Sequence, residues 1–135
     1  MLGRYVAARL EGMTESEGGR LFEVATSLLD MERYREAARV FERLQGVPAF
    51  QLGATEGLIA SFVGMERHEV AAQAATMALR FLQSAPRERV GILYWQARAL
   101  EGCDDLETAE ALYREVLALE PGHREAAERL RSLGS

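Results

Sequence analysis

The chain has 135 residues, of which 48% are hydrophobic, and a formal net charge of −5. A chain of this length can bury about two-thirds of its unfolded surface in one continuous core, so we expect a single domain over residues 1–135. The negative charge argues against nucleic acid or anionic lipid as the main partner, because both need a basic surface that releases counterions.

The first predicted element is a short helix within residues 1–13, where apolar residues recur at helical spacing. A capping-box pattern follows, in which Thr14 is followed three residues later by Glu17. This pattern predicts that a second helix begins at about Glu15. The helix within residues 1–13 therefore stands apart from the repeats that follow.

The chain repeats itself after 34 residues, because the tripeptide Met-Glu-Arg at residues 31–33 recurs at residues 65–67. Such a period is typical of helix–turn–helix repeats, which stack to bury one continuous core. The pattern predicts five segments, namely an N-terminal helix over residues 1–13, repeat units over 14–50, 51–86 and 87–122, and a capping helix over 123–135.

Large, small and aromatic residues occupy fixed positions in the first and third units. Each first helix has large residues around one alanine, and each second helix has an alanine followed four residues later by an aromatic residue. We expect the two helices of a unit to approach each other at these alanines. The second unit departs from the pattern, with Ile59 at the small position and Ala75 at the aromatic one. The matching residues are Leu21, Val24, Ala25, Leu28, Ala37 and Phe41 in the first unit and Leu93, Gln96, Ala97, Leu100, Ala109 and Tyr113 in the third.

This pattern resembles that of tetratricopeptide repeats. The resemblance implies an all-α fold, an α-solenoid of three helix–turn–helix units with an extra N-terminal helix and a C-terminal capping helix. In this family the first helices of successive units line a concave groove. The family therefore implies a module that binds a protein or peptide client and is not an enzyme.

Carried over position by position, the resemblance predicts a mainly apolar groove. Phe22 and Tyr94 can anchor a peptide there, and Arg98 can bind a carbonyl or a carboxylate. The alternative interpretation is that the aromatic residues are packed in the core, which helical spacing predicts equally well. The candidate peptide-binding residues are Phe22, Thr26, Leu29, Glu56, Ala60, Val63, Tyr94 and Arg98, with Glu101 next to them.

The basic residues exclude one known use of such a groove. Tetratricopeptide domains that hold the C-terminal carboxylate of heat-shock chaperones use Lys, Asn and Arg. All 16 basic residues of this chain are Arg, and it contains neither Lys nor Asn. We therefore expect that it does not form that clamp. The same composition is typical of a GC-rich genome and points to a bacterial origin.

A closer resemblance concerns the order of the elements together with two stretches, Leu-Phe-Glu-Val-Ala at 21–25 and Tyr-Arg-Glu-Ala-Ala-Arg-Val-Phe-Glu-Arg-Leu at 34–44. These stretches, with Gly57 and Leu58 at the start of the second repeat, are similar to class II chaperones of bacterial type III secretion. The resemblance implies a cytoplasmic chaperone that binds hydrophobic translocator subunits before export, with an N-terminal helix that helps to form a weak homodimer. The alternative is a free-standing scaffold or adaptor in another bacterial assembly.

No pattern in the sequence predicts a catalytic, metal or nucleotide site. His68, His123 and Cys103 do not have metal-ligand spacing, and no glycine-rich phosphate loop is present. The carboxylates fall on the solvent side of the helical pattern, where acid–base chemistry is not expected. We therefore expect no cofactor and no metal, both histidines as surface or packing residues, and Cys103 as a small, partly buried side chain.

The location of the protein is inferred from three features. A single cysteine rules out an internal disulfide and favours a reducing compartment. Residues 1–11 lack the apolar run of a secretory leader. No stretch approaches the roughly 20 apolar residues of a membrane span. We therefore expect a cytoplasmic protein without membrane insertion.

Overall fold

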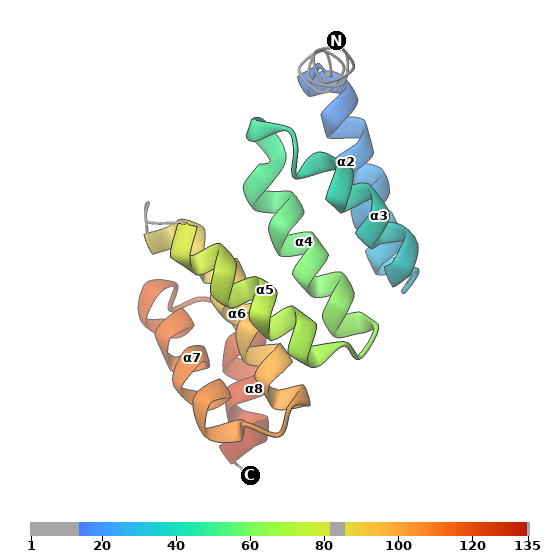
Figure 1. The fold of residues 1–135 in the computed structure, drawn as a ribbon. Helices are drawn as coiled ribbons and strands as arrows, with labels where there is room; N and C mark the ends of the chain where they lie inside the picture. The colour runs from blue at the N-terminus through green and yellow to red at the C-terminus, as the bar shows by residue number, and fades with distance from the viewer. Residues whose placement is uncertain (1–13, 82–85, 135) are drawn as a thin grey trace. The chain divides into compact units, whose positions relative to one another are not determined.

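The computed structural model describes residues 14–81 and 86–134. In these ranges the chain forms seven α-helices, one short 3₁₀ turn and no β-strand, which confirms the predicted all-α class (Figure 1). The predicted helix over residues 1–13 lies outside the described residues. The chain divides into two compact units between Ser61 and Phe62, inside α4 (Gln51–Gly64), and each unit is described by itself.

Unit 1 contains α2 (Glu15–Asp30), α3 (Tyr34–Leu44), a 3₁₀ turn (Pro48–Phe50) and the larger part of α4. The predicted start of α2 is confirmed, because the Thr14 side chain accepts a hydrogen bond from the Glu17 amide at 3.1 Å. This bond satisfies one of the amides that the first turn of a helix leaves without a partner.

The two helices α2 and α3 lie side by side in unit 1 (Figure 1). Ala25 on α2 and Ala37 on α3, the alanines predicted at this contact, are both fully buried. Small side chains at such positions let two helix axes approach closely. The repeat pattern therefore located the packing contact correctly.

Three phenylalanine rings pack together in unit 1. Phe22 contacts Phe41 edge-on, with 5.8 Å between ring centroids, and stacks on Phe50 at 6.1 Å. Glycines of α4 leave room for these rings. A Cβ atom at Gly57 would lie 2.4 Å from the Phe41 ring, and one at Gly53 would lie 2.8 Å from the Phe22 ring. These two positions therefore need glycine for close packing rather than for a special backbone angle.

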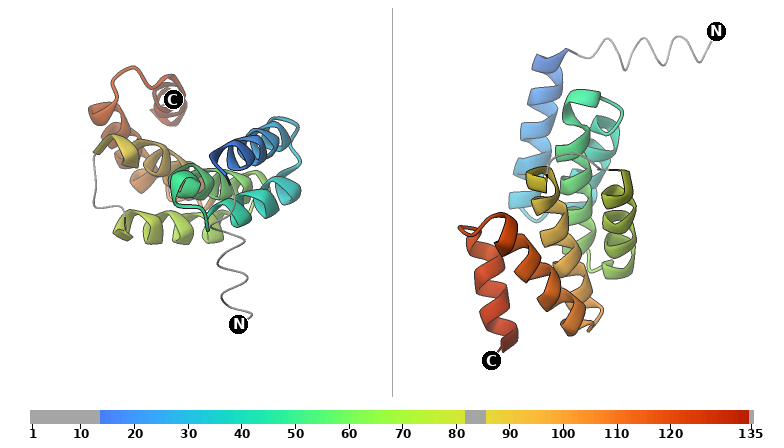
Figure 2. Two further views of the ribbon diagram at one scale, coloured as in Figure 1. Left: turned by 90° about the horizontal axis from the view of Figure 1, so that it is seen from above. Right: turned by 90° about the vertical axis from the view of Figure 1, so that its left-hand side faces the viewer.

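Unit 2 contains the end of α4 followed by α5 (His68–Phe81), α6 (Pro86–Gly102), α7 (Leu106–Leu119) and α8 (Arg124–Gly134). From α5 onward each helix packs against the next one (Figure 2). The predicted capping helix is present as α8. A cluster of buried residues at the centre of this unit consists of Val90, Leu93, Tyr94, Ala97, Ala109, Tyr113, Val116 and Ala126.

The alanine-rich helix predicted in the second repeat corresponds to α5. Ala71 and Ala75 are fully buried, although Ala75 takes the position where the other two repeats have an aromatic residue. A hydrogen bond of 3.0 Å from the side-chain amide of Gln96 to the Thr76 hydroxyl also joins α6 to α5. Small side chains in α5 therefore serve as a buried packing surface, as Ala25 and Ala37 do in unit 1.

The turn between the two helices of each repeat has the same backbone structure three times. Glu32, Glu66 and Asp104 have φ angles of 60°, 61° and 61°, in the left-handed region that usually favours glycine. At the first turn the Glu32 amide donates to the Leu29 carbonyl at 2.9 Å, and the equivalent bond closes both other turns. This arrangement is a common way to end a helix. It confirms that the three repeats share one register.

Candidate functional site

The predicted peptide-binding residues of unit 1 differ in how accessible they are. Thr26 is exposed, and its hydroxyl donates to the Phe22 carbonyl at 2.9 Å. Phe22 and Leu29, on the same face of α2, are half-buried, as is Glu56 on α4. Ala60 is buried. The accessible part of this set is therefore Thr26, together with the exposed portions of Phe22, Leu29 and Glu56.

In unit 2 the predicted residues are more buried. Val63 is buried, and Tyr94 is only 7% exposed. The Tyr94 ring packs against Trp95, Tyr113 and His123, with centroid distances of 5.1, 5.9 and 5.1 Å. The ring therefore belongs to the core of this unit, and its hydroxyl is the part that meets a polar neighbour.

That neighbour is Arg98, one helical turn further along α6. The Arg98 Nη1 donates to the Tyr94 hydroxyl at 3.1 Å, and the Arg98 Cζ lies 5.7 Å from the centroid of the Trp95 ring. A guanidinium over an indole ring is attracted by the negative face of the ring. Two contacts thus fix the position of a half-buried cation.

Arg98 lines a cleft of about 330 Å³ within unit 2. The cleft lies at the C-terminal ends of α4 and α6, beside the start of α5 and against α8. Its lining is mainly polar and carries charges of both signs. Besides Arg98, the charged or polar residues that line it are Glu66, His68, Glu101 and Arg129.

Glu101 lies at the centre of a hydrogen-bond network in this cleft, and its side chain is only 11% exposed. The Tyr113 hydroxyl donates to Glu101 Oε1 at 2.6 Å, and Arg129 Nε donates to the same oxygen at 3.1 Å. Arg129 Nη2 donates to the other oxygen, Oε2. The network therefore joins three helices, α6, α7 and α8, through one carboxylate.

The pKa of Glu101 reflects a balance of opposing effects. Burial raises the pKa, but the hydrogen bonds from Arg129 and Tyr113 and the positive charges of Arg129 and Arg98 outweigh it, so the pKa lies below the ordinary value of 4.5. Burial and the same hydrogen bond raise the pKa of Tyr113 far above its ordinary value. The prediction that carboxylates fall on the solvent side is therefore wrong for Glu101, because a repeat pattern does not show which polar side chains meet across helices.

No model of a protein family matches this sequence, and no curated protein matches it. Solved structures match its fold. The first TPR domain of Spaghetti (RPAP3), bound to the HSP90 peptide SRMEEVD, has a TM-score of 0.72 at 19% identity and covers 90% of this chain and 94% of that one. The translocator chaperone SycD of type III secretion in Yersinia enterocolitica has a TM-score of 0.72 at 19% identity, covering 94% and 92%. PcrH, in complex with the chaperone binding region of PopB, has a TM-score of 0.72 at 20% identity, covering 90% and 98%.

The chain has the tetratricopeptide-repeat fold.

In this fold the two histidines, His68 and His123, are packing residues, as predicted. The His68 ring lies where a side chain at Gly102 would be, since a Cβ there would come within 2.2 Å of it. His123 Nδ1 accepts a hydrogen bond of 3.1 Å from the Ala126 amide and so caps the start of α8.

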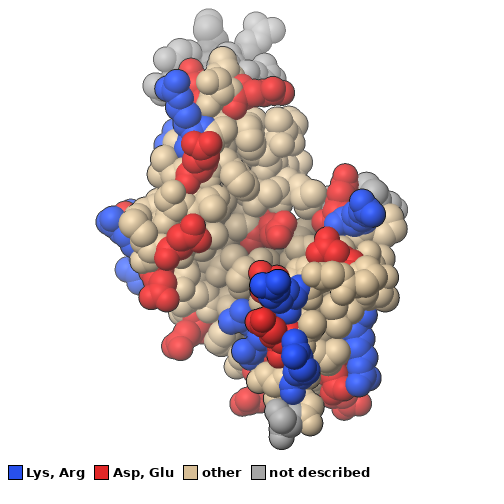
Figure 3. Space-filling model, turned by 180° about the vertical axis from the view of Figure 1, so that it is seen from behind, with Lys and Arg blue, Asp and Glu red and all other residues tan. Residues whose placement is uncertain are grey.

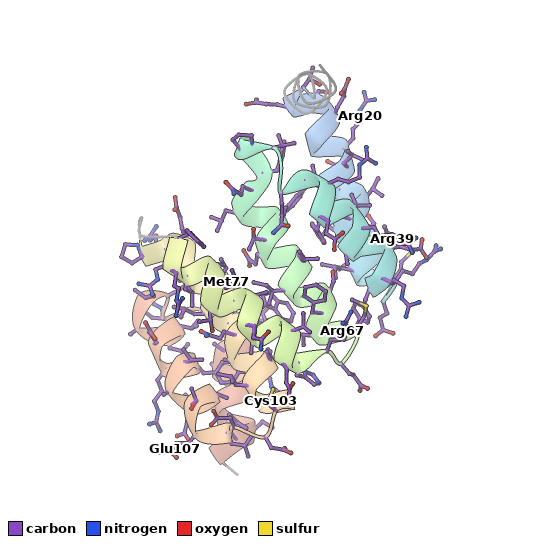
Figure 4. The ribbon with its side chains drawn as sticks, in the orientation of Figure 1. Arg20, Arg39, Arg67, Met77, Cys103 and Glu107 are labelled. Carbon is purple, nitrogen blue, oxygen red and sulfur yellow. The ribbon has the colours of Figure 1, made fainter. Side chains whose placement is uncertain are left out.

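Cys103 is exposed, so the prediction of a partly buried cysteine is wrong. The residue lies in the turn after α6 (Figure 4), where its amide donates to the carbonyls of Ala99 and Leu100 and its side chain is free of the core. Partial desolvation and the carboxylates of Glu69, Asp105 and Asp104 raise the pKa of its thiol. A raised pKa lowers the fraction of reactive thiolate at neutral pH.

Two residues of the Glu101 hydrogen-bond network, Tyr113 and Arg129, were not among the predicted binding residues. Tyr113 was expected only as a core ring, although a buried tyrosine hydroxyl needs a partner. Arg129 lies 28 residues from Glu101 in the sequence, and no local pattern connects them. The aromatic position at Tyr113 was therefore the one signal that could have pointed to this network.

Three further observations concern the surface charges, possible metal sites and the hydropathy of the helices. On the face shown in Figure 3, acidic and basic side chains are interspersed and do not form a field of one sign. Within the described ranges, no group of three or more His, Cys, Asp or Glu residues is arranged to hold a metal ion. No helix in those ranges is both long and apolar enough to cross a membrane.

Proposed function

We propose that this protein is a cytoplasmic, chaperone-like tetratricopeptide module that holds an apolar segment of a client protein, as in type III secretion. The observation that carries the proposal is the match to SycD and PcrH, which extends over 92% and 98% of those chains. PcrH is solved with the chaperone binding region of PopB. A shared fold over nearly the whole length supports a similar way of using the surface.

The proposed mechanism is competition for apolar surface. In unit 1, the half-buried edges of Phe22 and Leu29 flank the exposed Thr26 along one face of α2. Apolar side chains of a client would cover these edges and so be kept from aggregating with other copies of the client. In unit 2, the client would meet Arg98 at the polar cleft. We also propose the weak homodimer that the family resemblance implies.

An apolar client fits this chain better than an acidic peptide such as SRMEEVD. The chain has no Lys and no Asn with which to build the carboxylate clamp, and its net charge of −5 repels an acidic ligand over a distance. The proposed client is therefore an apolar segment with few charges.

The proposal can be tested by capturing partners from the lysate of the source organism. A charge placed between Phe22 and Leu29 by Thr26→Glu should weaken client capture at least tenfold, or about 1.4 kcal/mol, because the client would have to bury it. Ser27→Glu is the matched control, since Ser27 is also exposed but lies about 100° around the helix. Helical content measured by circular dichroism should be unchanged in both variants.

The partner itself decides between the two functional hypotheses. A client that is poorly soluble alone, and that is lost with Thr26→Glu but kept with Ser27→Glu, supports the chaperone. Partners that are soluble without this protein and bind both variants equally would contradict it. They would instead support the free-standing scaffold or adaptor in another assembly.

A further inference from the structure

The outer side of α5 in unit 2 carries a row of apolar residues, the outer α5 stripe, which consists of Val70, Ala74, Met77 and Phe81. These residues follow one another at steps of four, three and four positions, so they lie within about 60° of one another around the helix. Val70, Met77 and Phe81 are 36%, 58% and 81% exposed, and Ala74 is half-buried. Figure 4 labels Met77 on this helix. The fully buried alanines of α5 lie on its other side, so the stripe is a second apolar face.

The repeat itself does not require this stripe. In the second helices of the other two repeats, α3 and α7, the positions equivalent to Val70 and Met77 hold exposed polar residues. These residues are Glu36 and Arg43 in α3 and Thr108 and Glu115 in α7. Among the three second helices, exposed apolar residues at these two positions are therefore specific to α5. A contiguous exposed apolar surface of this kind marks a contact with a partner.

The spacing of the stripe is that of one helix packed along another. Steps of four, three and four are the alternating a and d positions of a heptad repeat, with Ala74 and Phe81 at a and Val70 and Met77 at d. Residues at a and d are buried when a second helix lies along them. The partner that fits the stripe is therefore a helix rather than an extended segment.

The stripe is complementary in shape to a second copy of itself that runs in the opposite direction. Around a two-fold axis, Ala74 of one copy lies opposite Met77 of the other, and Val70 lies opposite Phe81. A smaller side chain then always meets a larger one, which fills the contact evenly. In a parallel pair each residue would meet itself, and Ala74 against Ala74 would leave a gap.

Two charges beside the stripe favour the same orientation. Glu69 and Arg80 lie on one flank of α5, near its two ends, and both are exposed. A two-fold axis between antiparallel helices brings this flank next to its own copy, with Glu69 near Arg80 of the second copy at both ends. A parallel pair would instead place each charge beside its own copy. Charge complementarity therefore selects a second copy of this chain in antiparallel orientation.

We propose that the outer α5 stripe is the contact surface of a homodimer, in which α5 of one copy packs antiparallel against α5 of the other. The inference rests on the proposed function for the homodimer alone, and it places the contact on α5 instead of the N-terminal helix. A helix of 14 residues is about 21 Å long, so one pair buries less than the roughly 1,600 Å² of a standard interface. The dimer should therefore be weak, with a Kd of about 10–500 μM.

Sedimentation velocity of the full chain tests the proposal, at concentrations from about 5 μM to about 1 mM, where such a Kd gives a measurable monomer–dimer equilibrium. Met77→Glu should raise the Kd at least about tenfold, because the contact would have to bury two unpaired carboxylates. Leu106→Glu is the matched control. It also replaces an exposed apolar side chain of unit 2 by Glu, but at the first residue of α7, and it should leave the equilibrium unchanged.

Charge reversal tests the antiparallel orientation. Glu69→Arg and Arg80→Glu should each weaken the dimer about threefold, because each variant places like charges together at both ends of the contact. The double variant should recover most of the wild-type affinity, since opposite charges meet again. A parallel pair would have like charges in all four proteins and would show no such recovery. A double variant that stays as weak as the single variants would therefore overturn the antiparallel contact.

Three further results would overturn the inference. They are a wild-type chain that stays monomeric at about 1 mM, a dimer that Met77→Glu and Leu106→Glu weaken equally, and a dimer that Val6→Glu weakens while Met77→Glu does not. The last result would assign the contact to the predicted N-terminal helix. Circular dichroism should show unchanged helical content in every variant.

The chaperone proposal is judged separately, by client capture with Thr26→Glu. A monomeric Met77→Glu variant that still captures the client would support the α5 contact and leave the chaperone proposal standing. A wild-type dimer that Met77→Glu dissociates, but that captures no poorly soluble client, would support the α5 contact and reject only the chaperone.

Discussion

The first and third repeats use the same aromatic pair in different chemical settings. Phe22 and Phe41 in unit 1 correspond in the repeat to Tyr94 and Tyr113 in unit 2, and the rings of each pair lie 5.8 and 5.9 Å apart. In unit 1 the pair is apolar and packs against a third ring and α4 glycines. In unit 2 each ring carries a hydroxyl, and each hydroxyl has a charged partner.

The partners of those hydroxyls also stand at equivalent positions. Where unit 1 has Thr26 and Leu29, unit 2 has Arg98 and Glu101. In unit 2 the two hydroxyls and their two charged partners therefore occur together, because a buried hydroxyl without an acceptor or donor would cost free energy. One repeat geometry can therefore support either an apolar core or a polar network, provided that all members of the network are present.

The largest expected difference between the two repeats is in the cost of removing a ring. Tyr94→Ala should destabilise unit 2 by about 3–5 kcal/mol, because the ring is nearly fully buried among three other rings. Phe22→Ala should cost less, about 2 kcal/mol, because that ring is only half-buried. Urea unfolding followed by circular dichroism measures both. An equal or larger loss of stability in Phe22→Ala would contradict the predicted difference between the two repeats.

Exchanging the hydroxyls between the repeats should have an intermediate effect. Tyr113→Phe should cost about 1.5–3 kcal/mol, because it removes a hydrogen bond to a charged carboxylate. Phe41→Tyr should cost about 1–3 kcal/mol for another reason, since it adds a hydroxyl to the ring carbon Cζ, which already packs closely against Gly57 of α4. Thermal melting of the two single variants tests this pair. A neutral Phe41→Tyr would mean that the packing against Gly57 leaves room for the hydroxyl.

Low pH should lower the stability of unit 2 through Glu101. At the equivalent position unit 1 has Leu29, which does not titrate. The folded pKa of Glu101 is below its ordinary value of 4.5, so its stabilising effect is present above about pH 4.5 and is lost as the pH falls further. The urea midpoint from Trp95 fluorescence should therefore drop below that pH. The drop should be smaller in Glu101→Gln, where this carboxyl group is absent. An identical pH dependence in the variant would assign the acid sensitivity to other groups.

The sequence predicted those parts of the structure that depend on local chemistry. The start of α2 followed from the Thr14 cap, and the buried Ala25 and Ala37 followed from the 34-residue period, because both signals lie within one or two helices. The turns also followed the period, even with Glu32 in place of glycine. Elements defined by spacing along the chain could thus be found without a structure.

The candidate site was less predictable because it depends on contacts between helices. Arg98 was singled out by its position, but its contacts with Tyr94 and Trp95 require the rotamers of α6. The bond between Glu101 and Arg129 joins residues 28 positions apart, on helices whose relative rotation the period does not specify. Whether the predicted groove residues bind a client remains a prediction that the experiments above address.

The exposed Cys103 gives the protein a built-in labelling position. A maleimide dye can attach to only one residue of the wild-type chain, and Trp95 is the only energy donor of its kind, in the same helix–turn segment of unit 2. The raised pKa of the thiol means that labelling should proceed faster in mildly alkaline buffer than at neutral pH. Energy transfer from Trp95 to a dye on Cys103 would then follow the unfolding of the C-terminal part of α6 without any substitution in the chain.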